Sequence, residues 1–114
     1  MKLKEVARVL NARVICGEKH LEKEVEYAFA SDLMSDALTV EKNNVLLITG
    51  LANIQSVRTS EMLLANSILF VRNKKVSPEM KELAEQNDMV LLEFSGSMFK
   101  ASGILYNAGL KPVY

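Results

Sequence analysis

The sequence predicts an α/β fold with three layers, α/β/α, around a small, mainly parallel sheet built from βα repeats. The first observation is a set of three apolar runs at near-equal intervals, over residues 45–48, 68–71 and 89–92. Runs that are apolar at every position are typical of strands buried on both faces, as in parallel sheets. The second observation is that each run is followed by a polar or glycine-containing loop and then by a segment with helical spacing. This alternation indicates βα units joined by right-handed crossovers.

Two of the helices have clear start signals. Asn53 is expected to cap a helix over residues 54–64, because its side chain accepts hydrogen bonds from the free amides of the first turn. Ser77 supplies a capping hydroxyl, and Pro78 follows it at the first helical position. The second helix is expected to run from there to about Gln86.

Shorter patterns predict the remaining elements. They are helices over residues 3–10 and 32–40, a last helix that opens at 95–97 and stops at 107–109, and strands over 13–16 and 25–30. The two strands are expected either to lie beside the parallel core or to pair with each other as an edge.

Length and composition describe one globular domain spanning residues 1–114. Hydrophobic residues make up 49% and charged residues 25% of the chain, values that exclude disorder. Fourteen Lys and Arg balance fourteen Asp and Glu, so nucleic acid is not an expected partner, because proteins that bind it normally carry a basic excess. No apolar run approaches the roughly 20 residues that span a bilayer, and none at the start resembles a signal peptide. We therefore expect no membrane partner. Because Cys16 alone forms no internal disulfide, we expect a cytoplasmic protein.

Candidate binding residues cluster around the three loops that follow the apolar runs. In open α/β sheets, ligands bind outside the carboxyl ends of the parallel strands, where helices begin. The loops combine helix-start amides, small residues, hydroxyls and cations, which together can hold an anion such as a phosphate. The candidate ligand-binding residues are Thr49, Gly50, Asn53, Arg58, Arg72, Lys74, Ser95, Gly96 and Ser97.

The alternative to a binding site is that these loops are ordinary capped turns, with Lys74 and Lys75 as a solvated charge pair. Arg58 would then form a surface ion pair with Glu61 or Glu41.

No pattern indicates catalysis, a metal site or a cofactor. The one histidine, His20, and the one cysteine, Cys16, have no spacing typical of metal ligands. Neither a Gly-Lys-Ser/Thr phosphate loop nor a dinucleotide-binding glycine motif is present. We therefore do not expect an enzyme; the catalytic alternative is a phosphotransfer or hydrolase accessory that depends on Asp32 or Arg58. Ser31 and Asp32 end a strand and are expected to cap the next helix, or else to approach a ligand.

Several segments resemble the DRTGG domain, and the resemblance covers nearly the whole chain. It rests on residues 1–7 (MKLKEVA), 28–36 (AFASDLMSD), 47–51 (LITGL), 53–62 (NIQSVRTSEM) and 68–72 (ILFVR). The chain looks most like the stand-alone members of that family in bacteria and archaea. More distantly, it is similar to the amino-terminal domain of HPr kinase/phosphorylase. The resemblance implies the same three-layer α/β/α fold with a small, mainly parallel sheet.

The resemblance also implies a regulatory role. DRTGG domains accompany CBS domains in regulated inorganic pyrophosphatases and occur in phosphotransacetylases and cobyrinic-acid-synthase-like proteins. There they look like dimer-forming regulatory modules associated with adenine-nucleotide control. This chain has no contiguous Asp-Arg-Thr-Gly-Gly. Where larger members carry Gly-Asp-Arg after the strand, Gly50 is followed here by Leu51, and at the place of a Gly-Gly after the next strand, Arg72 is followed by Asn73. Only Gly50 is carried over from the pattern, and its expected role is conformational.

The sequence therefore predicts a non-catalytic regulatory module that forms a homodimer. Its expected ligand is an adenine nucleotide or another small anion, bound at the strand-end loops. The alternative is a protein–protein interaction module that docks a catalytic partner without a small molecule. Its candidate docking faces are the apolar, methionine-bearing segments 97–110 and 32–40.

Overall fold

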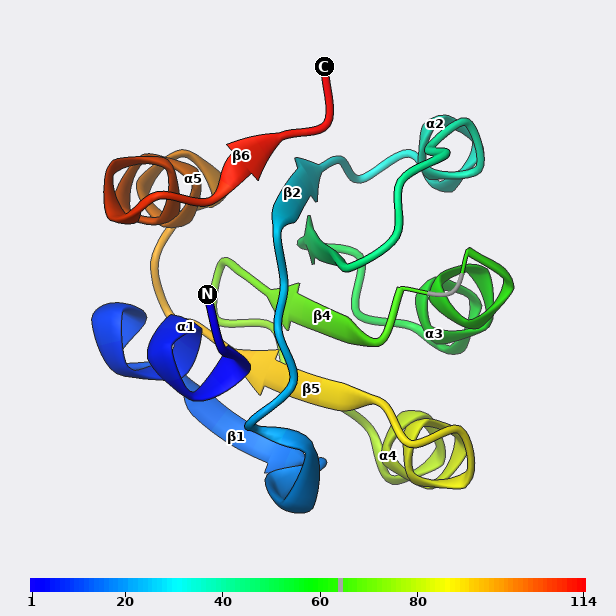
Figure 1. Cartoon of the computed structure of the whole chain (residues 1–114). Helices are drawn as coiled ribbons and strands as arrows, with labels where there is room; N and C mark the ends of the chain where they lie inside the picture. Colours follow the sequence, from blue (N-terminus) through cyan, green and yellow to red (C-terminus); the bar gives the residue numbers. More distant parts are fainter. Residues whose placement is uncertain (64) are drawn as a thin grey trace.

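The computed structural model describes residues 1–63 and 65–114 (Figure 1). In chain order the elements are α1 (Leu3–Leu10), β1 (Arg13–Cys16), the 3-10 turn η1 (Glu18–His20), β2 (Tyr27–Ala30), α2 (Met34–Ala37), β3 (Val45–Thr49), α3 (Ile54–Met62), β4 (Ser67–Phe70), α4 (Pro78–Gln86), β5 (Val90–Glu93), α5 (Met98–Ala108) and β6 (Lys111–Pro112). The helix expected over residues 54–64 ends at Met62, and residue 64 lies outside the described residues.

The described strands form one six-stranded sheet in the order β1-β5-β4-β3-β2-β6. The strands β2, β3, β4 and β5 are parallel neighbours in chain order. At one edge β6 is parallel to β2, and at the other edge β1 is antiparallel to β5. The prediction of a mainly parallel sheet is confirmed. Because β2 to β5 run in the same direction, the loops that follow them lie along one rim of the sheet.

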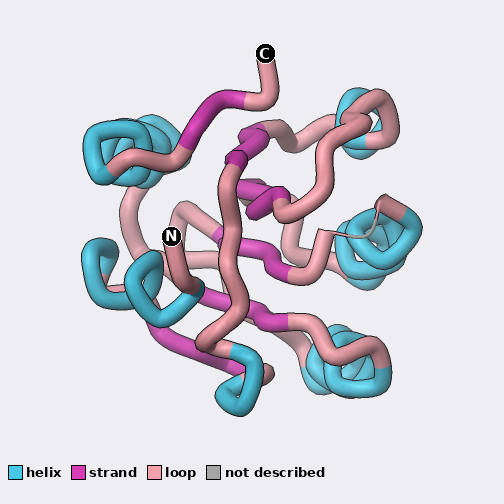
Figure 2. Tube along the Cα trace, viewed as in Figure 1, coloured by secondary structure: helices cyan, strands magenta, loops and turns pink. Residues whose placement is uncertain are grey.

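Helices cover both faces of the sheet and give the three-layer arrangement (Figures 1 and 2). On one face, α1 and α5 contribute Leu3 and Leu105 to a core shared with the strands. On the other face, α3 and α4 contribute Val57 and Met80 to a second core, which α2 extends. Every residue of β3, β4 and β5 is buried. The continuous apolar runs in the sequence therefore report burial on both faces of the sheet.

Side-chain caps position the helices that begin at the rim. Asn53, Ser77 and Ser97 each accept a hydrogen bond from the backbone N–H three residues further on, at 3.0, 3.2 and 3.0 Å respectively. The predicted start and end of α4 are confirmed, and α5 starts after the last of the three residues expected to open it. Each cap satisfies an amide that the first helical turn leaves without a partner.

The strands β1 and β2 lie beside the parallel core, at β5 and at β3 respectively, and do not pair with each other. The connection between them therefore crosses the width of the sheet (Figure 1). It runs along the start of α1, where the backbone N–H groups of Leu3 and Lys4 donate to the carbonyls of Lys23 and Leu21, both at 2.9 Å.

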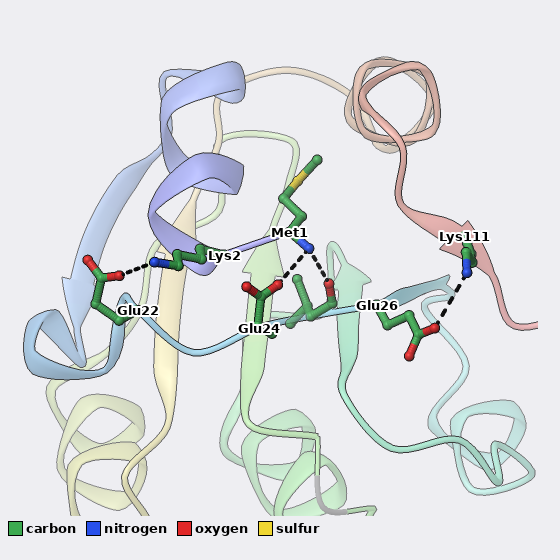
Figure 3. Close-up of polar contacts among 7 residues, drawn as sticks. Met1, Lys2, Glu22, Glu24, Glu26 and Lys111 are labelled. Atoms are coloured by element: carbon green, nitrogen blue, oxygen red, sulfur yellow. Dashed lines mark hydrogen bonds and ion pairs between the residues drawn. The ribbon is translucent and has the colours of Figure 1, made fainter.

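Ion pairs fasten this crossing segment at the amino end of the parallel strands (Figure 3). The α-amino group of Met1 donates to the Glu24 carboxylate at 2.9 Å, and Lys2 Nζ donates to Glu22 at 2.7 Å. Hydrogen bonds from Lys2 and Lys4 lower the pKa of Glu22 to about 2. The carboxylates of Glu22, Glu24 and Glu26 in this segment thus each pair with a cation.

Some large apolar side chains remain on the surface. Phe99 and Tyr106 on α5 are 89% and 70% exposed, and Leu33 and Leu38, which flank α2, are 57% and 50% exposed. Both segments named as docking faces from the sequence therefore present apolar groups to solvent. Among the described residues, the helices are all too short or too polar to cross a bilayer.

Candidate ligand site at the strand ends

The loops after β3, β4 and β5 lie next to one another, as the parallel arrangement requires. The backbone N–H of Val71 donates to the carbonyl of Thr49 at 3.0 Å, which joins the loops after β3 and β4. The N–H groups of Arg72 and Asn73 donate to the carbonyls of Gly96 and Phe94, at 2.7 and 3.1 Å, which join the loops after β4 and β5. The prediction that residues 50, 72 and 95 share one rim is confirmed.

Asp32, which follows β2, connects three of the candidate residues. Its Oδ1 atom accepts hydrogen bonds from the Gly50 N–H at 2.7 Å and from the Thr49 hydroxyl at 3.1 Å. Its Oδ2 atom accepts from the Arg72 guanidinium at 2.8 Å. Burial disfavours the charged carboxylate, but these donors outweigh it, so the pKa of Asp32 lies below its ordinary value. Asp32 is thus a built-in anion at the rim.

Ser31 and Asp32 do not cap the following helix, so that expectation is wrong. The residue before α2 is Leu33, and it makes no side-chain cap. The Ser31 hydroxyl accepts from the Leu33 N–H in a local turn at 3.0 Å, while Asp32 reaches across to the next strand. The physical reason is that the Gly50 amide and the Arg72 cation offer the carboxylate charge-assisted partners.

Gly50 leaves the space that the Arg72 side chain occupies. A Cβ atom at position 50 would lie 2.0 Å from Arg72 Nη2. Among the described glycines, only Gly17 and Gly109 have a positive φ angle, so the conformational role expected for Gly50 is wrong. Its role is steric, because the guanidinium passes over the glycine backbone on its way to Asp32.

The crevice between the ends of β4 and β5 is where the chain changes face. After β4 the chain enters α4, which packs on one face of the sheet, whereas after β5 it enters α5, which packs on the opposite face. In open α/β sheets, such a switch between neighbouring strands creates the crevice in which ligands bind. The two loops that flank it, 72–75 and 94–97, hold five of the nine candidate residues.

A pocket of about 150 Å³ opens beside this crevice, at the edge where β1 pairs with β5. Its lining residues are Asn11, Arg13, Asn73, Lys75, Glu93, Phe94 and Ser95. Glu93 is only 8% exposed. Its Oε2 atom accepts from the Val76 N–H at 2.7 Å, and its Oε1 atom lies 3.7 Å from Lys75 Nζ. The pocket therefore combines a buried carboxylate with two cationic side chains.

Of the residues that line this pocket, only Ser95 is among the candidate ligand-binding residues predicted from the sequence. A signal for Glu93 was present, since it is a charged residue directly after the apolar run 89–92 and hence at the end of a buried strand. Arg13 and Asn11 carried no such signal. They reach the pocket only because β1 pairs antiparallel with β5 and places Arg13 opposite Glu93.

The other candidate residues have varied surroundings. Asn53 and Ser97 cap α3 and α5, while Lys74 is exposed in the turn after β4. Among the described residues, the backbone N–H groups of Ser95, Gly96 and Ser97 donate no hydrogen bond. Arg58 is exposed in the second turn of α3.

The surface ion pair expected between Arg58 and Glu61 or Glu41 is wrong for the described residues. Every ion pair found among them joins other charged groups. All three side chains are exposed, and a solvated ion pair gains too little energy to hold long side chains in one geometry. Within the same residues, no hydrogen bond joins Arg58 to the other candidates.

Other reactive groups lie away from this rim. His20 Nε2 faces Asp88 Oδ1 at 3.5 Å, close to the amino end of β5. Cys16 is buried, and this burial raises the pKa of its thiol. Within residues 1–63 and 65–114, no three His, Cys, Asp or Glu side chains are grouped so that they could hold a metal ion.

The fold and the rim define an α/β protein with a strand-end crevice at a topological switch point. No known protein family matches the sequence, and no curated protein matches it. Among solved structures, the chain is similar to the CBS and DRTGG domains of the regulatory region of Clostridium perfringens pyrophosphatase, a crystal structure of the complex with the activator diadenosine tetraphosphate. The TM-score is 0.72 at 17% sequence identity, over 98% of this chain and 48% of that chain. The chain thus shares the fold over about half the length of that region.

Proposed function

We propose that this chain is a cytoplasmic, non-catalytic regulatory module of the DRTGG type that forms a homodimer. Its ligand is an adenine nucleotide or another small anion, bound in the crevice between β4 and β5. The observation that carries the proposal is the switch of face between α4 and α5, which opens a crevice at the carboxyl ends of two central strands. The fold shared with a regulatory region that binds diadenosine tetraphosphate supports a regulatory role.

The charges and donors of the crevice favour an anionic ligand. Arg72 is neutralised by Asp32, and Lys75 faces Glu93. Arg13 and Lys74 take part in none of the ion pairs of the described residues, so they leave an excess of positive charge. The unused N–H groups of residues 95–97 stand at the start of α5, where the helix dipole also favours an anion.

The proposal predicts that lysines at the carboxyl end of the strands contribute to nucleotide affinity. Titration calorimetry with ATP is expected to show saturable binding to the wild-type protein. Replacing Lys74 and Lys75 together by glutamine is expected to weaken it about tenfold, because each lysine contributes a screened attraction to phosphate. Raising the salt concentration is expected to narrow this difference.

The matched control replaces two lysines at the amino end of the strands, Lys42 and Lys111. Lys42 precedes β3, and Lys111 pairs in register with Tyr27, the first residue of β2. The control protein carries the same net charge as the test protein, and its affinity for ATP is expected to stay within about twofold of wild type. Equal losses in the two double variants, or no binding at millimolar ATP, would reject the proposed site.

A second candidate function is an interaction module that docks a catalytic partner without a small molecule. The exposure of Phe99 and Tyr106 on α5 favours it, because large apolar side chains grouped on a surface often mark an interface. The same face is available for the proposed homodimer. Sedimentation velocity is expected to give twice the monomer mass for wild type and a shift toward monomer when Phe99 and Tyr106 are both replaced by serine. A wild-type monomer at all concentrations would remove the dimer from the proposal.

A further inference from the structure

Glu93 has an oxygen atom without a hydrogen-bond partner in the protein. Its Oε2 atom is held by the Val76 N–H, whereas Oε1 is shielded from solvent and accepts no hydrogen bond from the described residues. Leaving a buried carboxylate oxygen without a donor is costly, and such atoms are rare in folded proteins. A bound molecule can therefore supply the hydrogen-bond donor that Glu93 Oε1 lacks.

Lys75 forms an ion pair with this oxygen but no hydrogen bond. Its Nζ atom lies 3.7 Å from Oε1, beyond hydrogen-bond distance, and its side chain is 64% exposed. The same ammonium group donates to Asn73 Oδ1 at 3.2 Å, so it is held only at the surface. A ligand that enters the pocket can displace the flexible lysine side chain from Glu93 and keep its charge as a partner.

The rest of the pocket sets the character of that ligand. Arg13 and Lys75 provide two positive charges against the single carboxylate of Glu93, so the ligand must carry negative charge as well as a donor. The volume of about 150 Å³ is smaller than that of pockets which enclose drug-sized molecules, and it suits a group of about the size of one sugar ring. In α/β nucleotide sites, a carboxylate near a strand end commonly accepts from ribose hydroxyls.

We propose that this pocket binds the hydroxyl-bearing ring of a phosphorylated ligand, with Glu93 Oε1 accepting from its hydroxyls and Arg13 and Lys75 binding its phosphate. The assignment rests on the proposed function, because it specifies which part of the anionic ligand enters the pocket beside the crevice. A nucleotide and a free sugar phosphate share this chemistry. The arms of the test separate these two sources.

The test compares four ligands on the wild-type protein: ATP, 2′,3′-dideoxy-ATP, ribose 5-phosphate and inorganic triphosphate. ATP is expected to bind about tenfold or more tightly than the dideoxy analogue, because the analogue lacks the hydroxyls that would donate to a charged acceptor. If ribose 5-phosphate binds as tightly as ATP, the ligand of this pocket is a free sugar phosphate. If ATP binds more tightly than ribose 5-phosphate, the base and the further phosphates contribute to the affinity, and the ligand is a nucleotide.

The variant Glu93→Gln tests the acceptor itself. With its oxygen held by the Val76 N–H, the glutamine turns an amide nitrogen toward the pocket. Because this nitrogen is a donor and not an acceptor, the preference for ATP over the dideoxy analogue is expected to fall to about twofold or less. The control Glu26→Gln removes an exposed carboxylate at the other end of the sheet and is expected to keep the full preference. Arg13→Gln is expected to weaken both nucleotides alike and to leave their ratio unchanged, which is informative even if Glu93→Gln fails to fold.

The outcomes separate this assignment from the proposed function. Equal binding of ATP and dideoxy-ATP to the wild-type protein overturns the assignment and leaves the proposed function standing. Binding of inorganic triphosphate as tightly as ATP also overturns it, since the ring would then contribute nothing. If none of the four ligands binds, the assignment and the proposed anion site both fail.

Discussion

Replacing Gly17 by alanine is expected to lower the free energy of unfolding by about 3 kcal/mol. Gly17 has a φ angle of +89°, which costs an L-residue about 1–2 kcal/mol. A Cβ atom at this position would lie 2.7 Å from the carbonyl oxygen of Met89 and 2.8 Å from Cα of Val90. Because these are backbone atoms, the clash must displace the start of β5 from β1. Urea denaturation measures this loss. If the unfolding free energy falls with urea concentration at the same slope as in the wild type, the variant is still folded.

Gly109→Ala is the matched control for this prediction. Gly109 also has a positive φ angle, +113°, but a Cβ atom there would meet nothing within 4 Å. The control is expected to lose only about 1–2 kcal/mol, from the backbone conformation. Equal losses at the two positions would show that close packing of β1 on β5 contributes nothing at Gly17. That packing matters for the pocket, because it holds Arg13 opposite Glu93.

Removing the Asp32 carboxylate is expected to cost about 2 kcal/mol at neutral pH. The variant Asp32→Ala deprives the Gly50 N–H, the Thr49 hydroxyl and the Arg72 guanidinium of their shared acceptor. Most of the loss comes from the Gly50 amide and the Thr49 hydroxyl, since both residues are buried. The ion pair with Arg72 contributes less, because both side chains are more than 40% exposed and solvent screens the attraction.

The contribution of Asp32 should depend on pH in a defined direction. The pKa of Asp32 is lower in the folded protein than in the unfolded chain. Its stabilising effect is therefore fully present above the unfolded pKa of about 4, and it is lost as the pH falls through the lower, folded pKa. The difference in unfolding free energy between wild type and Asp32→Ala is expected to shrink over that range.

Asp36→Ala serves as the control for the Asp32 prediction. Asp36 is exposed on α2, and its side chain makes no hydrogen bond or ion pair with the described residues. Its replacement is expected to change stability by less than about 0.5 kcal/mol. If Asp32→Ala is as mild as Asp36→Ala, the hydrogen bonds of the Asp32 carboxylate do not stabilise the rim.

The repeated local pattern explains why the sheet could be predicted from the sequence. The three apolar runs became β3, β4 and β5, each shifted by at most one residue from the expected bounds. The Ser77-Pro78 signal gave the start of α4, because a cap and a proline act within a single turn. The shared rim followed from the parallel direction of the strands alone.

Contacts between distant residues explain what the sequence did not reveal. Asp32 and Arg72 are 40 positions apart, and nothing local indicates that one carboxylate would take up the Gly50 amide, the Thr49 hydroxyl and the Arg72 cation together. The short strand β6 has only two residues, too few for an alternating pattern. The pocket at Glu93 depends on the antiparallel pairing of β1, which the sequence left open between two arrangements.

The proposed function places an anionic ligand in the crevice between β4 and β5, where the chain enters α4 on one face of the sheet and α5 on the other. It is tested most directly by following the backbone amide signals of labelled protein during a titration with ATP. The largest shifts are expected at residues 72–75 and 94–97 and at Arg13 and Glu93, with small ones at Lys42 and Lys111. Shifts concentrated at the amino end of the strands, around Glu24 and Glu26, would contradict it.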